Sequence, residues 1–201
     1  MSAAREYGLD EQYEWARPPA GGWTADDLDR LPNLPPHTEL IDGSLVFVSP
    51  QTEFHMRMMR LLENALLDQA PADFEVFREF TVEIDSRNRP EPDVAVVRAG
   101  ADTGARRTRL RSEDVVLAVE VVSQDSVARD REVKPGKYAK AGIQHFWRIE
   151  EDGGLPVVYA FELDPATSAY GPVGIFHNRL KLTLPFLIDI DLTAINRRGR
   201  L

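Results

Sequence analysis

Two acidic residues lie in stretches of the chain that are otherwise apolar. Glu120 belongs to the run Val115-Val-Leu-Ala-Val-Glu-Val-Val122, whose apolar residues on both alternating faces are typical of a strand buried on both sides. Asp93 follows Pro92 and opens a second such run, residues 94–97. A buried carboxylate is normally paired, protonated or bound to metal, and two at close range repel unless a divalent cation lies between them.

Lys134 adds a cation of a scarce type. The chain contains 20 Arg and only 4 Lys, yet three of the lysines fall within residues 134–140. Lysine offers a compact charge with rotatable donors, which suits a phosphate oxygen or an attacking water. We therefore predict a metal and catalytic centre at Asp93, Glu120 and Lys134, whose oxygen ligands favour Mg²⁺ or Mn²⁺.

Each of these residues also has a purely structural interpretation. Glu120 could form a buried ion pair with an arginine. Asp93 could be a turn or capping residue, because Asp readily accepts hydrogen bonds from nearby backbone amides. The lysines could cover a solvated helix face, which is our interpretation of Lys137 and Lys140.

The elements expected to position these residues follow a mixed α/β order. Apolar runs on either side of Asp42-Gly43 predict a β-hairpin over residues 39–48, since this dipeptide suits a tight type I′ turn. An apolar stripe at three- and four-residue steps predicts an amphipathic helix over residues 52–69 that covers a sheet. Strands are expected at 74–84, 93–97, 115–123, 145–150 and 156–163, with a β-rich region at 174–184 and an apolar segment at 186–195.

Two further segments lie close to the candidate residues in sequence. Pro135 disfavours a helical conformation at the preceding residue, so a short helix is expected from Pro135 to Ala141, with Gly142 ending it and Lys134 just before it. Residues 98–112 are charged and predict a surface loop with candidate phosphate contacts. These contacts are Arg106, Arg107, Arg109 and Arg111.

The first 38 residues are rich in Pro and Gly and predict an arm laid against the main domain. Within the arm, Thr24-Ala-Asp-Asp-Leu28 predicts a short helix capped by Thr24. The absence of Cys excludes disulfides and thiolate metal sites, and no apolar run is long enough for a membrane helix. We expect a cytoplasmic protein with one core. The net charge of −9 argues against a protein that coats nucleic acid through bulk charge.

Several motifs along the chain carry a family resemblance. They are Pro92-Asp93, Glu120-Val-Val-Ser123, Asp130-Arg-x-x-Lys134-x-x-x-Tyr138-Ala-x-Ala-Gly142-Ile and Phe146-Trp147, preceded by Glu39-Leu-Ile-Asp-Gly43, Ser49-Pro50 and His55. Their order and spacing resemble the Uma-type family of restriction-endonuclease-like proteins, in the PD-(D/E)XK nuclease-like superfamily. The resemblance covers roughly residues 24–190.

This resemblance implies a restriction-endonuclease-like three-layer α/β fold, with a central mixed β-sheet flanked by helices, in a domain over residues 39–201. It also implies Mg²⁺ bound by Asp93 and Glu120, and endonuclease activity on DNA. In the parent pattern the lysine lies two residues after the second acid, but that position is Val122 here. Lys134, from the following helix, is the residue that matches the Uma-type branch.

Three more residues are candidates, two of them through the resemblance. Glu39 would add a catalytic carboxylate from the first hairpin, and His55 would face the site from the amphipathic helix. Each also has an ordinary interpretation, Glu39 as an exposed strand residue and His55 as a packing or surface residue. Tyr138 lies about one helical turn beyond Lys134 and could orient the lysine or simply pack.

Two other classes of function stay open at this point. One is a catalytically inactive nuclease-fold protein that binds nucleic acid or protein, which the acidic charge and the missing in-strand lysine permit. The other is a structural or dimerisation module, in which apolar surface near Phe186-Leu-Ile-Asp-Ile190 forms a homodimer interface. The sequence specifies neither a cleavage site nor DNA over RNA, and no recognition motif such as a helix-turn-helix stands out.

Overall fold

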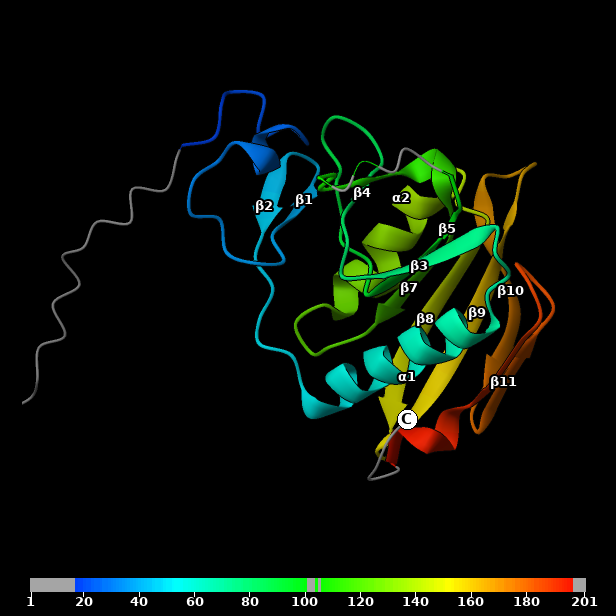
Figure 1. The fold of residues 1–201 in the computed structure, drawn as a ribbon. Coiled ribbons are helices and arrows are strands. Elements are labelled where there is room, and N and C mark those ends of the chain that lie inside the picture. Colours follow the sequence, from blue (N-terminus) through cyan, green and yellow to red (C-terminus); the bar gives the residue numbers. More distant parts are fainter. Residues whose placement is uncertain (1–16, 101–103, 105, 197–201) are drawn as a thin grey trace, which may run out of the picture.

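The computed structural model of the chain describes residues 17–100, 104 and 106–196, and its centre is a six-stranded sheet. The strands are β3 (Phe74–Arg78), β5 (Val94–Arg98), β7 (Val115–Val121), β8 (His145–Asp152), β9 (Leu155–Asp164) and β10 (Ala169–Phe176). Their order is β10-β9-β8-β7-β5-β3 (Figure 1). The pair β7 and β8 is parallel and every other pair is antiparallel, so the predicted mixed sheet is confirmed.

Shorter elements surround this sheet. Three two-stranded sheets pair β1 (Glu39–Ile41) with β2 (Ser44–Val46), β4 (Val82–Glu83) with β6 (Leu110–Arg111), and β11 (Arg179–Leu182) with β12 (Ile188–Asp191). The α-helices are α1 (Glu53–Gln69) and α2 (Lys134–Lys140). The single turns of other helix types are η1 (Asp27–Asp29), η2 (Ser112–Asp114), the π-helical η3 (Arg129–Val133) and η4 (Leu192–Asn196).

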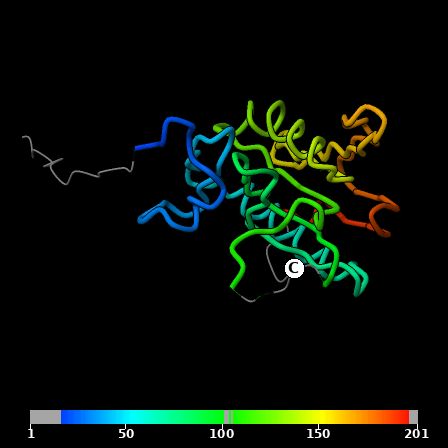
Figure 2. The backbone as a smooth tube through the Cα atoms, turned by 90° about the horizontal axis from the view of Figure 1, so that it is seen from above, coloured from blue at the N-terminus to red at the C-terminus, as the bar shows by residue number. Residues whose placement is uncertain are grey.

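The two α-helices cover opposite faces of the sheet, as Figure 2 shows from above. On β5, Val94 and Val96 belong to the core under α1, whereas Ala95 and Val97 belong to the core that contains Tyr138 of α2. This alternation explains why β5 is apolar from Val94 to Val97, because both of its faces are buried there. The predicted three-layer fold is confirmed.

The predicted hairpin and amphipathic helix both form. Asp42 and Gly43 have φ of 52° and 77°, the left-handed values that a type I′ turn between β1 and β2 requires. The Thr52 hydroxyl caps α1 by accepting a hydrogen bond from the His55 backbone N–H at 3.2 Å. Leu62, on the buried face of α1, is fully enclosed in the core.

Residues 17–38 lie against this hairpin at one end of the molecule (Figure 2). The Trp23 backbone N–H donates to the Gly43 carbonyl at 2.8 Å. The predicted cap of the short helix is wrong: the residue before η1 is Asp26, and the Thr24 hydroxyl donates to the Asp27 carboxylate at 2.7 Å. The division into an arm and a domain stays a prediction, and residues 1–16 of that arm lie outside the described residues.

Three predicted boundaries differ from the structure. The strand expected over 74–84 is broken, because Glu79 has a φ of 49° and separates β3 from β4. The β-rich region at 174–184 divides between β10 and β11. The loop at 98–112 ends in β6, which pairs with β4 in parallel and so fastens the end of the loop.

The prediction that Lys134 precedes the helix is also wrong. Lys134 has helical angles, φ −61° and ψ −43°, and continues η3 into α2. Its backbone N–H donates to the Arg129 carbonyl, five residues back, which is the wide turn of a π-helix. This wide turn lets the helix continue through Pro135, which has no N–H to donate.

The apolar segment near Phe186 lies mostly in the core of the chain itself. Phe186, Ile188 and Ile190 are 7%, 0% and 2% exposed, and only Leu187, at 74%, faces outward. The segment therefore offers little of the apolar surface on which the homodimer prediction was based. The homodimer itself stays a prediction.

Candidate metal and catalytic site

The fold brings the six candidate residues together from distant parts of the chain. Five of them line one cavity of about 40 Å³, which exceeds the roughly 10–15 Å³ that a single water needs. The candidates lining it are Glu39, His55, Asp93, Glu120 and Lys134. The sixth, Tyr138, contacts Glu120 through its hydroxyl.

Glu120 lies on β7 with its carboxylate toward α2, and it is only 2% exposed. The Lys134 Nζ donates to its Oε2 at 3.0 Å, and the Tyr138 hydroxyl donates to its Oε1 at 2.6 Å. The buried ion pair considered for Glu120 therefore exists, but its cation is Lys134 rather than an arginine. Tyr138 both packs, with its ring 6.0 Å from that of Phe146, and orients the carboxylate.

Lys134 faces two more carboxylates. Its Nζ lies 2.8 Å from Glu39 Oε1 and 3.4 Å from Asp130 Oδ1, and the lysine is 4% exposed. Asp130 precedes Lys134 by about one helical turn, so the two side chains meet on one side of η3 and α2. Sequence analysis included Asp130 in a motif but did not predict it as a site residue.

One ammonium therefore stands among three buried carboxylates. Burial raises the pKa of Glu120 well above its ordinary value, against the attraction of Lys134. Burial raises the pKa of Asp130 as well. Burial lowers the pKa of Lys134, but the charges of Glu120, Glu39 and Asp130 outweigh it and raise that pKa. Lys134 is thus held in its charged form, and this one ammonium faces three buried carboxyl groups.

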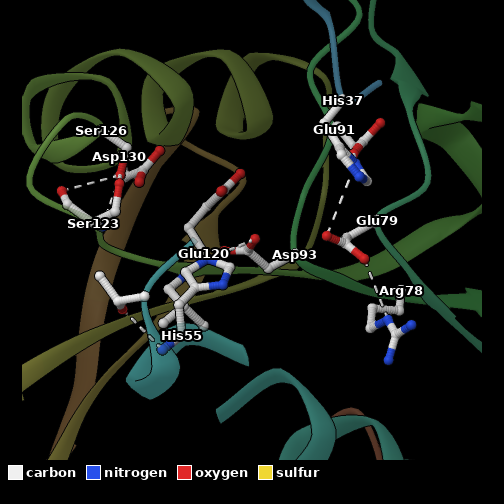
Figure 3. A network of polar contacts seen from close by, with 12 residues as sticks. His37, His55, Arg78, Glu79, Glu91, Asp93, Glu120, Ser123, Ser126 and Asp130 are labelled. Atoms are coloured by element: carbon white, nitrogen blue, oxygen red, sulfur yellow. Dashed lines mark hydrogen bonds and ion pairs between the residues drawn. The ribbon is translucent and has the colours of Figure 1, made fainter. Parts of the chain in front are cut away.

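Asp93 faces the same cavity from the start of β5, beside His55 (Figure 3). The His55 Nε2 lies 3.0 Å from Asp93 Oδ1, and the Val121 backbone N–H donates to Asp93 Oδ2 at 2.6 Å. Val121 directly follows Glu120 on β7, so the neighbouring strand fixes the position of the Asp93 carboxylate. The His55 Nδ1 is buried and has no hydrogen-bond partner in the described part of the chain.

A second charged group lines the cavity on the side of the arm, and sequence analysis missed it. The His37 Nδ1 lies 2.5 Å from Glu91 Oε1 and 3.9 Å from Glu79 Oε1 (Figure 3). Burial lowers the pKa of His37, but Glu91 and Glu79 outweigh it and raise that pKa. Glu91 lies between Pro90 and Pro92, close to the candidate Asp93, and this position in the sequence could have indicated it. His37 lies in the arm, where no motif or periodicity marks it.

Arg129 is a further residue that sequence analysis missed. It lines the cavity from the first position of η3, and its buried Nε has no hydrogen-bond partner among residues 17–100, 104 and 106–196. The other basic side chains of the cavity each lie beside a carboxylate: Lys134, His55 and His37. The Arg129 guanidinium is therefore available for an anion, and its fork of donors matches a phosphate.

The arginines of the 98–112 loop have intramolecular partners. Arg107 pairs with Glu75, Arg109 with Asp26, Asp29 and Glu83, and Arg111 with Glu113. The Arg107 guanidinium also lies over the Phe77 ring, 4.8 Å from its centroid. Three of the four arginines predicted as phosphate contacts therefore tie the loop to its surroundings.

The donor set of the first cavity suits a hard divalent cation. The cavity is lined by carboxylates, and the buried Asp130 Oδ1 accepts no hydrogen bond from the described residues. Within the same residues, no group of three or more His, Asp or Glu is already arranged to hold a metal. Magnesium does not need one, because it usually takes one or two carboxylates and keeps several waters. Asp93 and Glu120 fit that requirement.

Comparisons with known proteins point to nucleases. A crystal structure of a putative nuclease belonging to DUF820, from Anabaena variabilis, matches with a TM-score of 0.55 and 16% identity, covering 81% of this chain and 89% of that chain. At this identity the likeness shows a shared fold. No curated protein matches the chain. None of the helices within the described residues combines the length and apolar character needed to cross a membrane.

The family model described as putative restriction endonuclease, Uma2, matches residues 25–194. This range contains every candidate site residue, from Glu39 to Tyr138. The chain therefore belongs to the Uma2 family of putative restriction endonucleases.

Proposed function

We propose that this chain is a divalent-metal-dependent endonuclease that hydrolyses phosphodiester bonds of DNA. The observation that carries the proposal is the cavity lined by Asp93, Glu120 and Lys134, in which one lysine faces three buried carboxyl groups. Family membership supports the nuclease class. The DNA substrate, the metal, the cytoplasmic location and the homodimer are parts of the proposal.

Asp93 and Glu120 would hold the cation, Mg²⁺ or Mn²⁺. Such an ion, when bound, supplies Lewis-acid polarisation of the phosphate and a water of lowered pKa. Val121 keeps the Asp93 carboxylate oriented through its backbone N–H. Tyr138 does the same for Glu120 through its hydroxyl.

The cations of the cavity would act on the phosphate. Lys134 is held in its charged form and can donate to a phosphate oxygen or position the attacking water. Arg129, with no partner of its own in the described chain, would bind a second phosphate oxygen. Glu39 keeps Lys134 at the cavity through its 2.8 Å ion pair, which makes Glu39 a positioning residue rather than a ligand.

The test combines metal binding with cleavage. Mg²⁺ and Mn²⁺ are titrated calorimetrically into wild type, Glu120→Gln and the exposed control Glu151→Gln, and the same proteins are given supercoiled plasmid. We expect wild type and Glu151→Gln to bind metal and to nick plasmid only with metal, and Glu120→Gln to do neither. Asp93→Ala should also lose cleavage while circular dichroism shows a folded protein. Metal-dependent nicking by Asp93→Ala would sink the proposal.

A second candidate is a catalytically inactive member that binds nucleic acid or protein. It is favoured by the fact that both oxygens of Glu120 are already occupied, by Lys134 and Tyr138. Position 122, where the parent pattern has its lysine, is a valine. Metal binding by wild type without nicking of any plasmid would select this candidate.

A further inference from the structure

A second cavity, of about 300 Å³, lies on the other side of η3 and α2 from the candidate site. The first cavity is lined from this helical segment by Asp130 and Lys134, the second by Arg131, Pro135 and their neighbours. The two cavities share no lining residue. The volume is at the lower end of the range for small-ligand sites, and the proposed function does not use this cavity.

The floor of the second cavity is a stack of aromatic rings. Phe161 and Tyr170 both lie beside Phe146, with centroids 5.8 and 5.5 Å from its ring and interplanar angles of 26° and 27°. Tyr170 is fixed in this position because its hydroxyl donates to the Ile143 carbonyl at 2.8 Å. A planar ring can extend such a stack by lying against its open edge.

The rim of the second cavity is cationic. Arg131, Lys140 and Arg148 line it, and none of the described lining residues is acidic. Glu150, outside the lining, lies 3.0 Å from Arg131 Nε and 2.8 Å from Arg148 Nε, and holds both guanidinium groups in place. Three positive charges and one balancing carboxylate in a chain of net charge −9 select an anionic ligand.

Gly136 forms part of the wall of the second cavity. It occupies the second turn of helical structure after Asp130, lines the second cavity, and a Cβ placed on it would meet no atom within 4 Å. No packing in the protein therefore requires glycine there, although glycine weakens a helix. A larger side chain at this position would extend into the cavity.

We infer that the second cavity binds one nucleotide unit of a nucleic-acid strand. The base would stack on the ring assembly of Phe161 and Tyr170, and its phosphate would contact Lys140 and the two arginines. The two cavities share no lining residue, so a strand that reaches both places the bound unit away from the cleaved bond. This inference rests on the proposed function only for the position of the cleaved bond.

The test is binding of a fluorescein-labelled single-stranded oligothymidylate, followed by fluorescence anisotropy with EDTA present so that nothing is cleaved. Gly136→Leu should weaken binding about tenfold, the loss expected when one base no longer stacks. Lys140→Gln should weaken it by a smaller factor. Lys181→Gln removes another exposed lysine, from β11 on the opposite face of the sheet, and should bind as wild type does. Leucine favours helix at position 136, and thermal melts verify that the variant is folded.

Competition with small anions identifies what is recognised. We expect thymidine monophosphate to displace the oligonucleotide weakly and inorganic phosphate not to displace it. If thymidine monophosphate binds as tightly as the strand, the cavity recognises a free nucleotide rather than a strand, and the inference is overturned. Equal affinity of wild type and Gly136→Leu, or no binding by wild type, would also overturn it.

The outcomes separate this inference from the proposed function. Strand binding and cleavage are read on separate variants, because the two cavities share no lining residue. If strand binding depends on Gly136 but no plasmid is cleaved, the inference is supported and the proposed endonuclease activity is contradicted. If cleavage depends on Asp93 but Gly136→Leu binds the strand as wild type does, the proposed endonuclease activity is supported and the inference is contradicted.

Discussion

Lys134 is the residue through which the candidate site is joined. Its ammonium contacts acids from three elements: Glu39 of β1, Glu120 of β7 and Asp130 of η3. All four side chains are buried. The lysine therefore has a structural role as well as the proposed chemical one, because without it three buried carboxylates would have no fixed counter-charge.

Replacing Lys134 by Met should lower the free energy of unfolding by about 3–5 kcal/mol, the usual cost of removing one partner from a buried ion pair. Methionine keeps most of the side-chain volume, so the loss reports charge rather than a cavity. Urea denaturation of the metal-free protein at neutral pH measures it. A loss below about 1 kcal/mol would show that the acids are already neutralised by protons.

The same variant has two informative controls. Adding Glu120→Gln to Lys134→Met should recover part of the lost stability, since one of the unpaired carboxylates disappears. Adding Mn²⁺ to Lys134→Met should stabilise it more than it stabilises Glu120→Gln, because binding to the native state alone raises stability by mass action.

Some site residues could be predicted from sequence and others could not, for reasons of local pattern. Asp93 and Glu120 stood out because each interrupts a run of apolar residues that both faces of a sheet must bury. Arg129 and His37 interrupt nothing: both lie in polar segments, and only the folded chain shows that they line the cavity. The tests above decide which of them act on a substrate.

At the scale of elements, predictions failed where two local rules competed. The helix was expected to begin at Pro135, because the residue before a proline disfavours helix. The structure places Lys134 inside the helix through the π turn of η3, a feature that hydrophobic periodicity does not reveal. The turn of the first hairpin was predicted correctly, since Asp42-Gly43 has one strongly favoured geometry.

Two glycines with left-handed backbones provide a matched test of element geometry. Gly43 in the hairpin turn has a φ of 77°, and a Cβ there would lie 2.4 Å from Arg87 Nη2. Gly142, at the end of α2, has a φ of 80° and no atom within 4 Å of such a Cβ. Gly142→Ala should cost about 1–2 kcal/mol from the backbone alone. Gly43→Ala should cost about 1 kcal/mol more, because it disturbs the hydrogen bond from Arg87 to the Asp42 carbonyl.

Chemical denaturation of the two variants measures this difference. Equal losses would mean that Arg87 turns away without a free-energy cost. A larger loss in Gly142→Ala would contradict the crowding at Gly43 altogether.

On the scale of the whole molecule, charge is divided between the two sides of one short helical segment. The first cavity is rich in carboxylates, and the second has a cationic rim with no acid among its described lining residues. A net charge of −9 hides this division, which is why composition alone argued against contact with nucleic acid. Composition gives only the net charge, whereas binding of nucleic acid depends on where the positive and negative side chains lie.

The division predicts a modest salt dependence for strand binding. Besides Lys134, which three acids already surround, four cations are placed to meet phosphates: Arg129, Arg131, Lys140 and Arg148. About 0.7 counterions per contact give a slope of about −3 for the logarithm of the binding constant against that of salt concentration. Anisotropy titrations at increasing KCl measure it. A slope near −6 would bring the arginines of residues 106–111 back as contacts.

The charge balance around Lys134 also constrains how this protein can evolve. A descendant that no longer needs to cleave anything cannot drop Lys134 alone without a loss of stability, since its removal leaves three buried carboxylates without their counter-charge. Decay of the site must therefore begin at the acids or pass through compensating double substitutions. Selection for a folded chain alone would preserve the cluster long after selection for its chemistry had ended.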